Sequence, residues 1–189
     1  SLNTCFNAVD RHVLNGRGEQ DAILYDSPVT NTKKKITYSE LKHQVSIFAG
    51  GLKKLGVLKG DRVIIYMPMI PEAVVAMLAC GRIGAIHSVV FGGFASNELA
   101  SRIDDSKAKI LITASCGFEP GRTVEYRPLV DGALKLAKHQ VEKVILFQRK
   151  DHEIKLNKPL EISWDEALSG ASNKDCVEMG SNDYAYILY

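Results

Sequence analysis

Two arginines in a segment shaped by glycine and proline are the side chains best suited to binding an anion. The segment SCGFEPGRTVEYR, residues 115–127, follows a predicted strand and carries Arg122 and Arg127. A guanidinium group donates forked hydrogen bonds that match the geometry of phosphate oxygens. Such a loop could hold an anionic ligand. It could equally be a surface connection in which Arg122 pairs with Glu119 or Glu125.

A pair of glycines between a predicted strand and a predicted helix is the second candidate. The segment VVFGGFASNEL, residues 89–99, places Gly92 and Gly93 where ligands bind in open α/β sheets, at the carboxyl end of a strand. A residue without a side chain lets a flat ring or a phosphate approach the backbone. The segment is not the G-x-G-x-x-G motif of dinucleotide sites, and Asp104 and Asp105 come too early to bind a ribose. The spacing alone indicates a tight structural turn.

Charge and composition exclude several classes of protein. The 189 residues carry 24 basic and 22 acidic side chains, a balance that predicts neither nucleic acid nor a membrane surface as partner. The four cysteines are scattered, without the spacing of a zinc site or a disulfide framework, so we expect no metal site and a reducing compartment, cytoplasm or mitochondrial matrix. Neither a leader peptide nor an apolar stretch long enough to cross a bilayer is expected.

The elements that must position these residues alternate between helix and strand. This alternation predicts an α/β fold, a mostly parallel sheet with helices on both faces. Apolar spacing predicts helices over residues 37–56 (with Ser39 as cap), 71–83, 128–138 and 163–168, and one capped by Ser96; β-branched runs predict strands over 62–66, 85–91, 109–113 and 143–147. Residues 31–38 are expected to form a solvated hairpin turn, and the apolar run YAYILY, residues 184–189, a buried strand.

Four segments together resemble one enzyme family. LNTCFNAVDRH (residues 2–12), ITYSEL (36–41), the stretch 60–95 that contains YMPM and FGGF, and ITASCGFEPGRTVEY (112–126) resemble short-chain acyl-CoA synthetases of the adenylate-forming superfamily. Within this family, YDSPVTNT (25–32) and GFEPGRTVEY (117–126) are more similar to propionyl-CoA than to acetyl-CoA synthetases, which tend to carry a basic residue where Glu119 stands.

The resemblance implies that residues 1–189 are the front part of a large N-terminal domain. In the family, the strand matching residues 184–189 leads into a Thr/Ser/Gly-rich phosphate loop. That loop, the adenine segment, the carboxylate pocket, the ribose-binding aspartate and the C-terminal domain with its catalytic lysine are not among the 189 residues. The chain is therefore expected to hold no catalytic and no ATP-binding residue, and to be inactive alone.

The resemblance also implies a reaction and a ligand for this part of it. A short carboxylate, propionate rather than acetate, attacks the α-phosphate of ATP with Mg²⁺ to give an acyl-adenylate and pyrophosphate, and CoA then displaces AMP. Arg122 is expected to meet a CoA phosphate, and Gly93 to lie against its adenine. The implied CoA-binding residues are Gly93, Glu119, Pro120, Gly121 and Arg122.

Two alternatives of other classes remain at this point. One is a non-catalytic nucleotide-binding α/β module in which FGGFASNEL holds a ligand without chemistry. The other is half of a dinucleotide-dependent oxidoreductase, which the glycine spacing disfavours.

Overall fold

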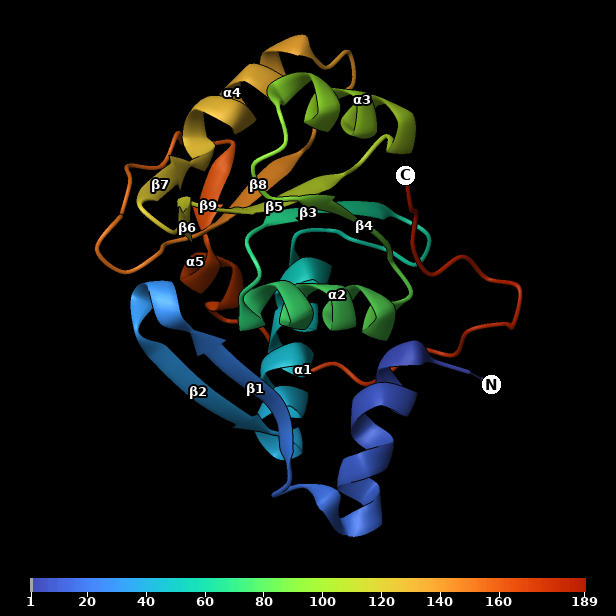
Figure 1. The fold of residues 1–189 in the computed structure, drawn as a ribbon. Coiled ribbons are helices and arrows are strands. Elements are labelled where there is room, and N and C mark those ends of the chain that lie inside the picture. The colour runs from blue at the N-terminus through green and yellow to red at the C-terminus, as the bar shows by residue number, and fades with distance from the viewer. Residues whose placement is uncertain (1) are drawn as a thin grey trace.

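A five-stranded parallel sheet forms the centre of the computed structural model, which describes residues 2–189 (Figure 1). Every neighbouring pair in the sheet is parallel, as the alternation of helix and strand predicted. The order across the sheet is β4 (Ile86–Phe91), β3 (Arg62–Met67), β5 (Ile110–Ala114), β8 (Lys143–Phe147) and β9 (Glu161–Ser163).

Helices cover both faces of this sheet, which confirms the predicted fold class. Helices α3 (Ser96–Ser106) and α4 (Tyr126–Leu136) pack together on one face. The opposite face carries α1 (Tyr38–Lys54), α2 (Pro71–Ile83) and the short α5 (Trp164–Leu168). Figure 1 shows the two helical layers above and below the sheet.

The central strands β3 and β5 are mostly apolar because both of their faces are covered. Ile64 and Ile65 on β3 and Leu111 and Ile112 on β5 are fully buried. Burying each such side chain stabilises the fold by about 1.5–3 kcal/mol relative to leaving it exposed. The core therefore explains why these strands were predictable from short β-branched runs.

Two predicted helix caps are wrong. The N-cap of α1 is Thr37, whose Oγ1 accepts from the backbone N–H of Glu40 at 3.2 Å, while the Glu40 carboxylate accepts from the Thr37 N–H at 2.8 Å. Ser39 already lies inside the helix, where its hydroxyl cannot cap the first turn. Ser96 is likewise the first residue of α3, after the N-cap Ala95, and it donates to the Leu129 carbonyl.

An N-terminal module precedes the sheet. It contains two short π-helices, η1 (Phe6–Asp10) and η2 (Val13–Arg17), and an antiparallel hairpin of β1 (Asp21–Ser27) and β2 (Thr32–Thr37) around the 3-10 turn η3 (Pro28–Thr30). Residues 31–35 are exposed as expected, but Ile36 is buried, and most of the segment 31–38 forms β2 rather than a turn. The lysines of β2 face solvent, where Lys33 pairs with Asp26 at 3.1 Å.

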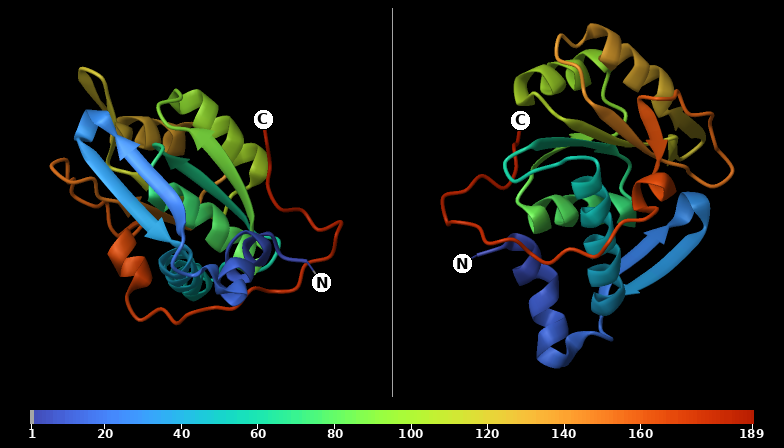
Figure 2. Two further views of the ribbon diagram at one scale, coloured as in Figure 1. Left: turned by 60° about the horizontal axis from the view of Figure 1, so that its bottom comes forward. Right: turned by 180° about the vertical axis from the view of Figure 1, so that it is seen from behind.

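The segment 184–189 is not the buried strand that its apolar residues predicted. Tyr184 and Leu188 are 80% and 77% exposed. The segment lies outside β4 in a parallel direction and makes one bridge, between Tyr186 and His87. Tyr189 contacts α3, where its hydroxyl donates to Asp105, but Tyr184, Tyr186 and Leu188 stay largely in solvent. Figure 2 shows how the connector of residues 169–183 crosses the helices from α5 to reach this edge.

A buried arginine of α2, Arg82, links the N-terminal module to the connector. Arg82, near the end of α2, donates to both carboxylate oxygens of Asp10 at 2.6 and 2.9 Å. The two side chains are only 1% and 8% exposed. Arg82 Nε also donates to the carbonyl of Lys174 in the connector. Burial alone would raise the pKa of Asp10, but the hydrogen bonds and charge of Arg82, with Lys42 nearby, hold it below its usual value.

Replacing Arg82 should destabilise the chain strongly. Arg82→Met keeps most of the side-chain volume but leaves the Asp10 carboxylate buried without its partner, which we expect to cost about 3–5 kcal/mol. Urea unfolding followed by the fluorescence of the single tryptophan, Trp164, which stacks on Phe48, measures this loss. Lys33→Met, at an exposed pair, is the control and should cost less than about 1 kcal/mol.

The same pair predicts an acid-sensitive contribution to stability. Because the pKa of Asp10 is lower in the folded chain than the unfolded value of about 3.9, the contribution is complete above about pH 4. It is lost as the pH falls through the folded pKa. The difference between wild type and Arg82→Met should therefore shrink in acid; a difference that stays constant down to about pH 2 would contradict the assignment.

Candidate functional site

The two segments singled out from the sequence leave the same edge of the sheet. The loop with Gly92 and Gly93 follows β4, and residues 115–127 follow β5. Both strands pair with β3 in parallel, so their carboxyl ends flank the carboxyl end of β3. This is the edge at which open α/β sheets bind their ligands.

Residues 115–127 form a hairpin rather than an irregular loop. Strands β6 (Cys116–Glu119) and β7 (Arg122–Glu125) pair in an antiparallel register that sets Glu119 opposite Arg122. Pro120 and Gly121 make the turn, and Gly121 has φ +77°, in the left-handed region that favours glycine. Sequence reasoning missed these strands because each has only four residues.

The two arginines of this segment have different roles. Arg122 is 70% exposed, and its guanidinium pairs with Glu119 at 2.6 Å, one of the two partners proposed for it. An exposed pair of this kind contributes about 0–1 kcal/mol, so a ligand can displace it. Arg127 is instead a structural residue, because it donates to the buried carboxylate of Glu161 and to the Lys155 carbonyl.

The loop of Gly93 is held open by a tyrosine of the neighbouring strand. The Gly93 N–H donates to the hydroxyl of Tyr66 at 3.2 Å, and that hydroxyl donates to the Phe94 carbonyl at 2.8 Å. Burial raises the pKa of Tyr66, which keeps the hydroxyl protonated and able to donate. Gly93 has φ +100°, and no atom lies within 4 Å of the place where a Cβ would stand. The backbone at Gly93 is therefore accessible to a flat ligand.

A second tyrosine fills the space between the two segments. A Cβ on Gly92 would lie 2.0 Å from the hydroxyl oxygen of Tyr126, and one on Gly117 would lie 2.9 Å from it. The Tyr126 ring is buried and lies 5.0 Å from the Tyr66 ring. Sequence reasoning missed both tyrosines, and the pair of small residues at 92 and 117 was the only signal of a bulky neighbour.

A cavity of about 250 Å³ lies between the two segments and the carboxyl end of β3. Glu119, Gly92 and Tyr126 line it, but Gly93, Pro120, Gly121 and Arg122 do not. The structure thus places Gly93 and the turn of the hairpin at one edge of the sheet without bringing them into one cavity.

Arg149 is a basic residue that sequence reasoning did not single out. It follows the carboxyl end of β8, and its guanidinium lies 5.0 Å from the centre of the Phe118 ring. It borders the cavity of about 250 Å³ and a neighbouring one of about 520 Å³, which the β1–β2 hairpin and the start of α2 also line. Its place at a strand end is the signal that could have identified it.

Neither cavity has the donors of a metal centre. Within residues 2–189, three side chains from His, Cys, Asp and Glu come close enough to share an ion in one place, formed by Cys5, Asp10 and Cys176. None of these three borders either cavity at the carboxyl edge. No helix in this part of the chain has the length and apolarity needed to cross a membrane.

Comparison with known proteins decides the family. The family described as AMP-binding enzyme matches residues 10–189. The chain belongs to this family. Over all 189 residues it is 57% identical to the acyl-CoA synthetase short-chain family member 3, mitochondrial, of Bos taurus and 56% identical to that of Homo sapiens. It is 46% identical to the acetyl-coenzyme A synthetase of Serratia proteamaculans. The resemblance to short-chain acyl-CoA synthetases is thereby confirmed.

The chain spans about 28% of the length of these curated mitochondrial relatives. The acetoacetyl-CoA synthetase structure from Streptomyces lividans has the same fold over the whole chain, with a TM-score of 0.87 and 23% identity, and the match covers 28% of that structure. The fold is thus that of the corresponding portion of an adenylate-forming enzyme.

The two glycines after β4 should respond differently to alanine. Gly92→Ala drives a methyl group into Tyr126 and should cost about 2–3 kcal/mol through overpacking. Gly93→Ala meets only the strain of a positive φ and should cost about 1–2 kcal/mol. Urea unfolding of both variants compares the two costs. A Gly92→Ala chain as stable as the wild type would show that Tyr126 does not hold the two segments in contact.

Proposed function

We propose that this chain is the front part of the N-terminal domain of an AMP-forming short-chain acyl-CoA synthetase, and that the enzyme activates propionate in preference to acetate. The observation that carries the proposal is the identity of 57% over every residue of the chain to a short-chain acyl-CoA synthetase. The reaction joins a carboxylate to CoA through an acyl-adenylate, releasing pyrophosphate and then AMP.

The contribution of this chain is to bind the nucleotide end of CoA. Arg122 sits at the turn of an exposed hairpin, where its guanidinium can exchange the Glu119 carboxylate for a phosphate. The pairing with Glu119 holds the arginine extended across the turn while CoA is absent. Gly93 offers unobstructed backbone against which an adenine ring can lie, and Pro120 and Gly121 shape the turn between the paired side chains.

Arg149 adds a second positive charge to the same edge. Its stack on Phe118 leaves the guanidinium at the border of the two cavities, where it raises the electrostatic potential for an incoming anion. The Arg149 guanidinium lies over the Phe118 ring, although Glu119 and Asp151 border the same two cavities.

Activation of the carboxylate belongs to groups outside these 189 residues. In the full-length enzyme, ATP would supply the phosphate that the carboxylate attacks, and Mg²⁺ held by groups outside these residues would neutralise charge on its oxygens. The side chains at the carboxyl edge do not form an oxygen-ligand set for Mg²⁺, so no step through the metal is assigned to them. Because the mammalian relatives are named mitochondrial, we place the enzyme in the mitochondrial matrix rather than the cytoplasm.

Arg122→Ala in the full-length enzyme should separate the two half-reactions. We expect the KM for CoA to rise about tenfold, since a charge-assisted hydrogen bond to phosphate contributes about 1.5–3 kcal/mol and this site is exposed. Carboxylate-dependent exchange of pyrophosphate into ATP should stay near the wild-type rate. Equal losses in both assays would exclude a role confined to CoA, and Lys138→Ala, at another exposed base, should change neither.

Glu119→Gln tests whether the carboxylate competes with the CoA phosphate for Arg122. Removing a negative charge beside the phosphate should lower the KM for CoA about threefold, from the Coulomb energy of two charges several ångströms apart in water. A higher KM would mean that Glu119 instead orients the arginine productively.

The substrate is tested with the full-length enzyme and acids of increasing chain length. We expect kcat/KM to be highest for propionate, lower for acetate and lower again for acids beyond butyrate. An enzyme with no carboxylate-dependent release of pyrophosphate would overturn the proposed reaction, and a maximum at acetate would overturn only the choice of acid. The 189-residue chain alone should release none.

A further inference from the structure

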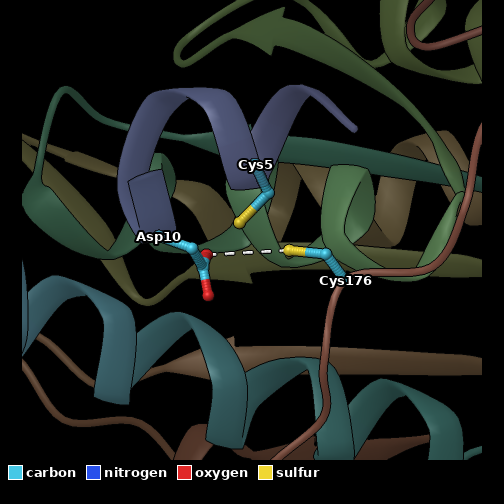
Figure 3. Close-up of side chains that lie close together, drawn as sticks. All are labelled: Cys5, Asp10 and Cys176. Carbon is cyan, nitrogen blue, oxygen red and sulfur yellow. Dashed lines mark hydrogen bonds between the residues drawn. The ribbon is translucent and has the colours of Figure 1, made fainter. Parts of the chain in front are cut away.

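Two cysteines from opposite ends of the chain lie beside the buried pair of Arg82 and Asp10, which we call the clamp. Figure 3 shows Cys5, Asp10 and Cys176. Cys5 lies just before η1, and Cys176 lies in the connector. Their sulfur atoms and a carboxylate oxygen of Asp10 all lie within 4.8 Å of one another. The Cys176 thiol donates to Asp10 at 3.6 Å. Cys5 is buried and Cys176 is half-buried, so the pair is reached from the connector side.

The surroundings make the two thiols unequal. The Arg82 guanidinium donates to the Cys5 sulfur at 3.3 Å as well as to Asp10. The neighbouring Cys176 thiol lowers the pKa of Cys5 most; burial opposes this, and the hydrogen bond and charge of Arg82 add to the lowering. The neighbouring Cys5 sulfur raises the pKa of Cys176 most, and burial raises it further. Cys5 is therefore the more acidic sulfur, with a protonated thiol beside it.

The charges at this cluster favour thiol chemistry over a bound metal. Both carboxylate oxygens of Asp10 already accept hydrogen bonds from Arg82, and Lys42 lies 3.7 Å from the same carboxylate. A divalent cation between the sulfurs and Asp10 would lie against a fixed guanidinium. The negative charge of Asp10 is already paired with Arg82, so the carboxylate is not free to bind a cation. Two thiols alone are a poor ligand set for zinc.

A cavity of about 150 Å³ opens on Cys176, the half-buried member of the pair, whereas Cys5 is fully buried and does not line it. Its lining includes Cys176 together with Asn3 and Phe6, which lie on either side of Cys5 in the chain. The space suits a small neutral oxidant such as a peroxide. A large disulfide substrate would require the connector to move away.

We propose that Cys5 and Cys176 are a peroxide-sensitive dithiol that closes to a disulfide and ties the N-terminal module to the connector. The Cys5 thiolate attacks one peroxide oxygen: an S–O bond forms, the O–O bond breaks, and the leaving hydroxide takes a proton to become water. Cys176 then attacks the Cys5 sulfenic acid, so that an S–S bond forms and the oxygen leaves as a second water. Two thiols are oxidised and one peroxide is reduced.

The disulfide would add a covalent link between the N-terminal module and the connector, which otherwise contact each other only through non-covalent interactions. Hydrogen bonds hold the connector to the rest of the chain. The Lys174 N–H donates to the Ser46 hydroxyl, and the Val177 N–H donates to the Arg82 carbonyl. Leu2 and Met179 form a β-bridge. A link between residues so far apart in sequence restricts the unfolded chain strongly. The oxidised protein should therefore resist heat and proteolysis of the connector better than the reduced one.

The test is peroxide treatment of the reduced full-length protein, followed by alkylation of the remaining thiols and peptide mapping. We expect a Cys5–Cys176 disulfide, a loss of about 2 Da for that pair, a higher Tm, and reversal of all three by dithiothreitol. Cys80 and Cys116 should stay alkylated, because burial raises the pKa of Cys116 and raises that of Cys80 to about 12. Oxidation that begins at Cys80 or Cys116, or a pair that stays reduced, would overturn the proposal.

Single variants separate the roles of the two sulfurs. Cys176→Ser should leave a sulfenic acid on Cys5 that a 1,3-diketone probe labels, while Cys5→Ser should be labelled at Cys176 at least about tenfold more slowly. Cys116→Ser is the matched control and should still form the disulfide. Stoichiometric zinc in the purified wild type that Cys5→Ser abolishes would overturn the proposal in favour of a metal site.

Discussion

The buried pair of Arg82 and Asp10 is the interaction on which the N-terminal half of the structure depends. A guanidinium removed from water loses several kcal/mol of hydration, and the loss is offset only if its donors are satisfied within the protein. Here Asp10, the Cys5 sulfur and the Lys174 carbonyl accept them. Because Arg82 and its acceptors together come from three segments distant in sequence, α2, the start of the chain around η1 and the connector must become ordered together.

The clamp and the candidate site lie at the two ends of the same helix. Helix α2 begins at Pro71, which borders the larger cavity at the carboxyl edge of the sheet, and Arg82 stands in its last turn. The charged groups at the two ends are correspondingly different. At the clamp they are buried and paired, as a structural role requires, while Arg122 is exposed and held by a weak pair that a ligand can replace.

The sequence was sufficient for the elements whose signal is local. The strand Lys143–Phe147 has the bounds predicted for it, and the helix beginning at Pro71 ends at Ile83 as expected, because a run of β-branched residues and an N-terminal proline are local signals. The prediction of a buried strand at residues 184–189 failed because an apolar run becomes buried only where another element covers it. Local pattern carries no information about that cover.

The sequence predicted where the candidate site lies but not which side chains and strand pairings build it. The carboxyl-edge rule located both Gly93 and residues 115–127, since each follows a predicted strand. Whether Arg122 pairs with an acidic neighbour depends on the register of the β6–β7 hairpin, and strands of four residues give no recognisable signal in the sequence. Tyr66 and Tyr126 were missed because their importance lies in what they touch: one binds the Gly93 loop, and the other fills the space left by two glycines.

The proximity of Cys5 and Cys176 shows the same limit and also links the clamp to redox chemistry. The guanidinium that neutralises Asp10 also contacts the Cys5 sulfur, so this buried cation would stabilise the thiolate once Cys5 loses its proton. Disulfide formation removes the thiolate and leaves the two hydrogen bonds from Arg82 to Asp10 in place. Oxidation would therefore lower the negative charge around Arg82 without leaving any buried charge unpaired, and the fold could carry either redox state on the same scaffold.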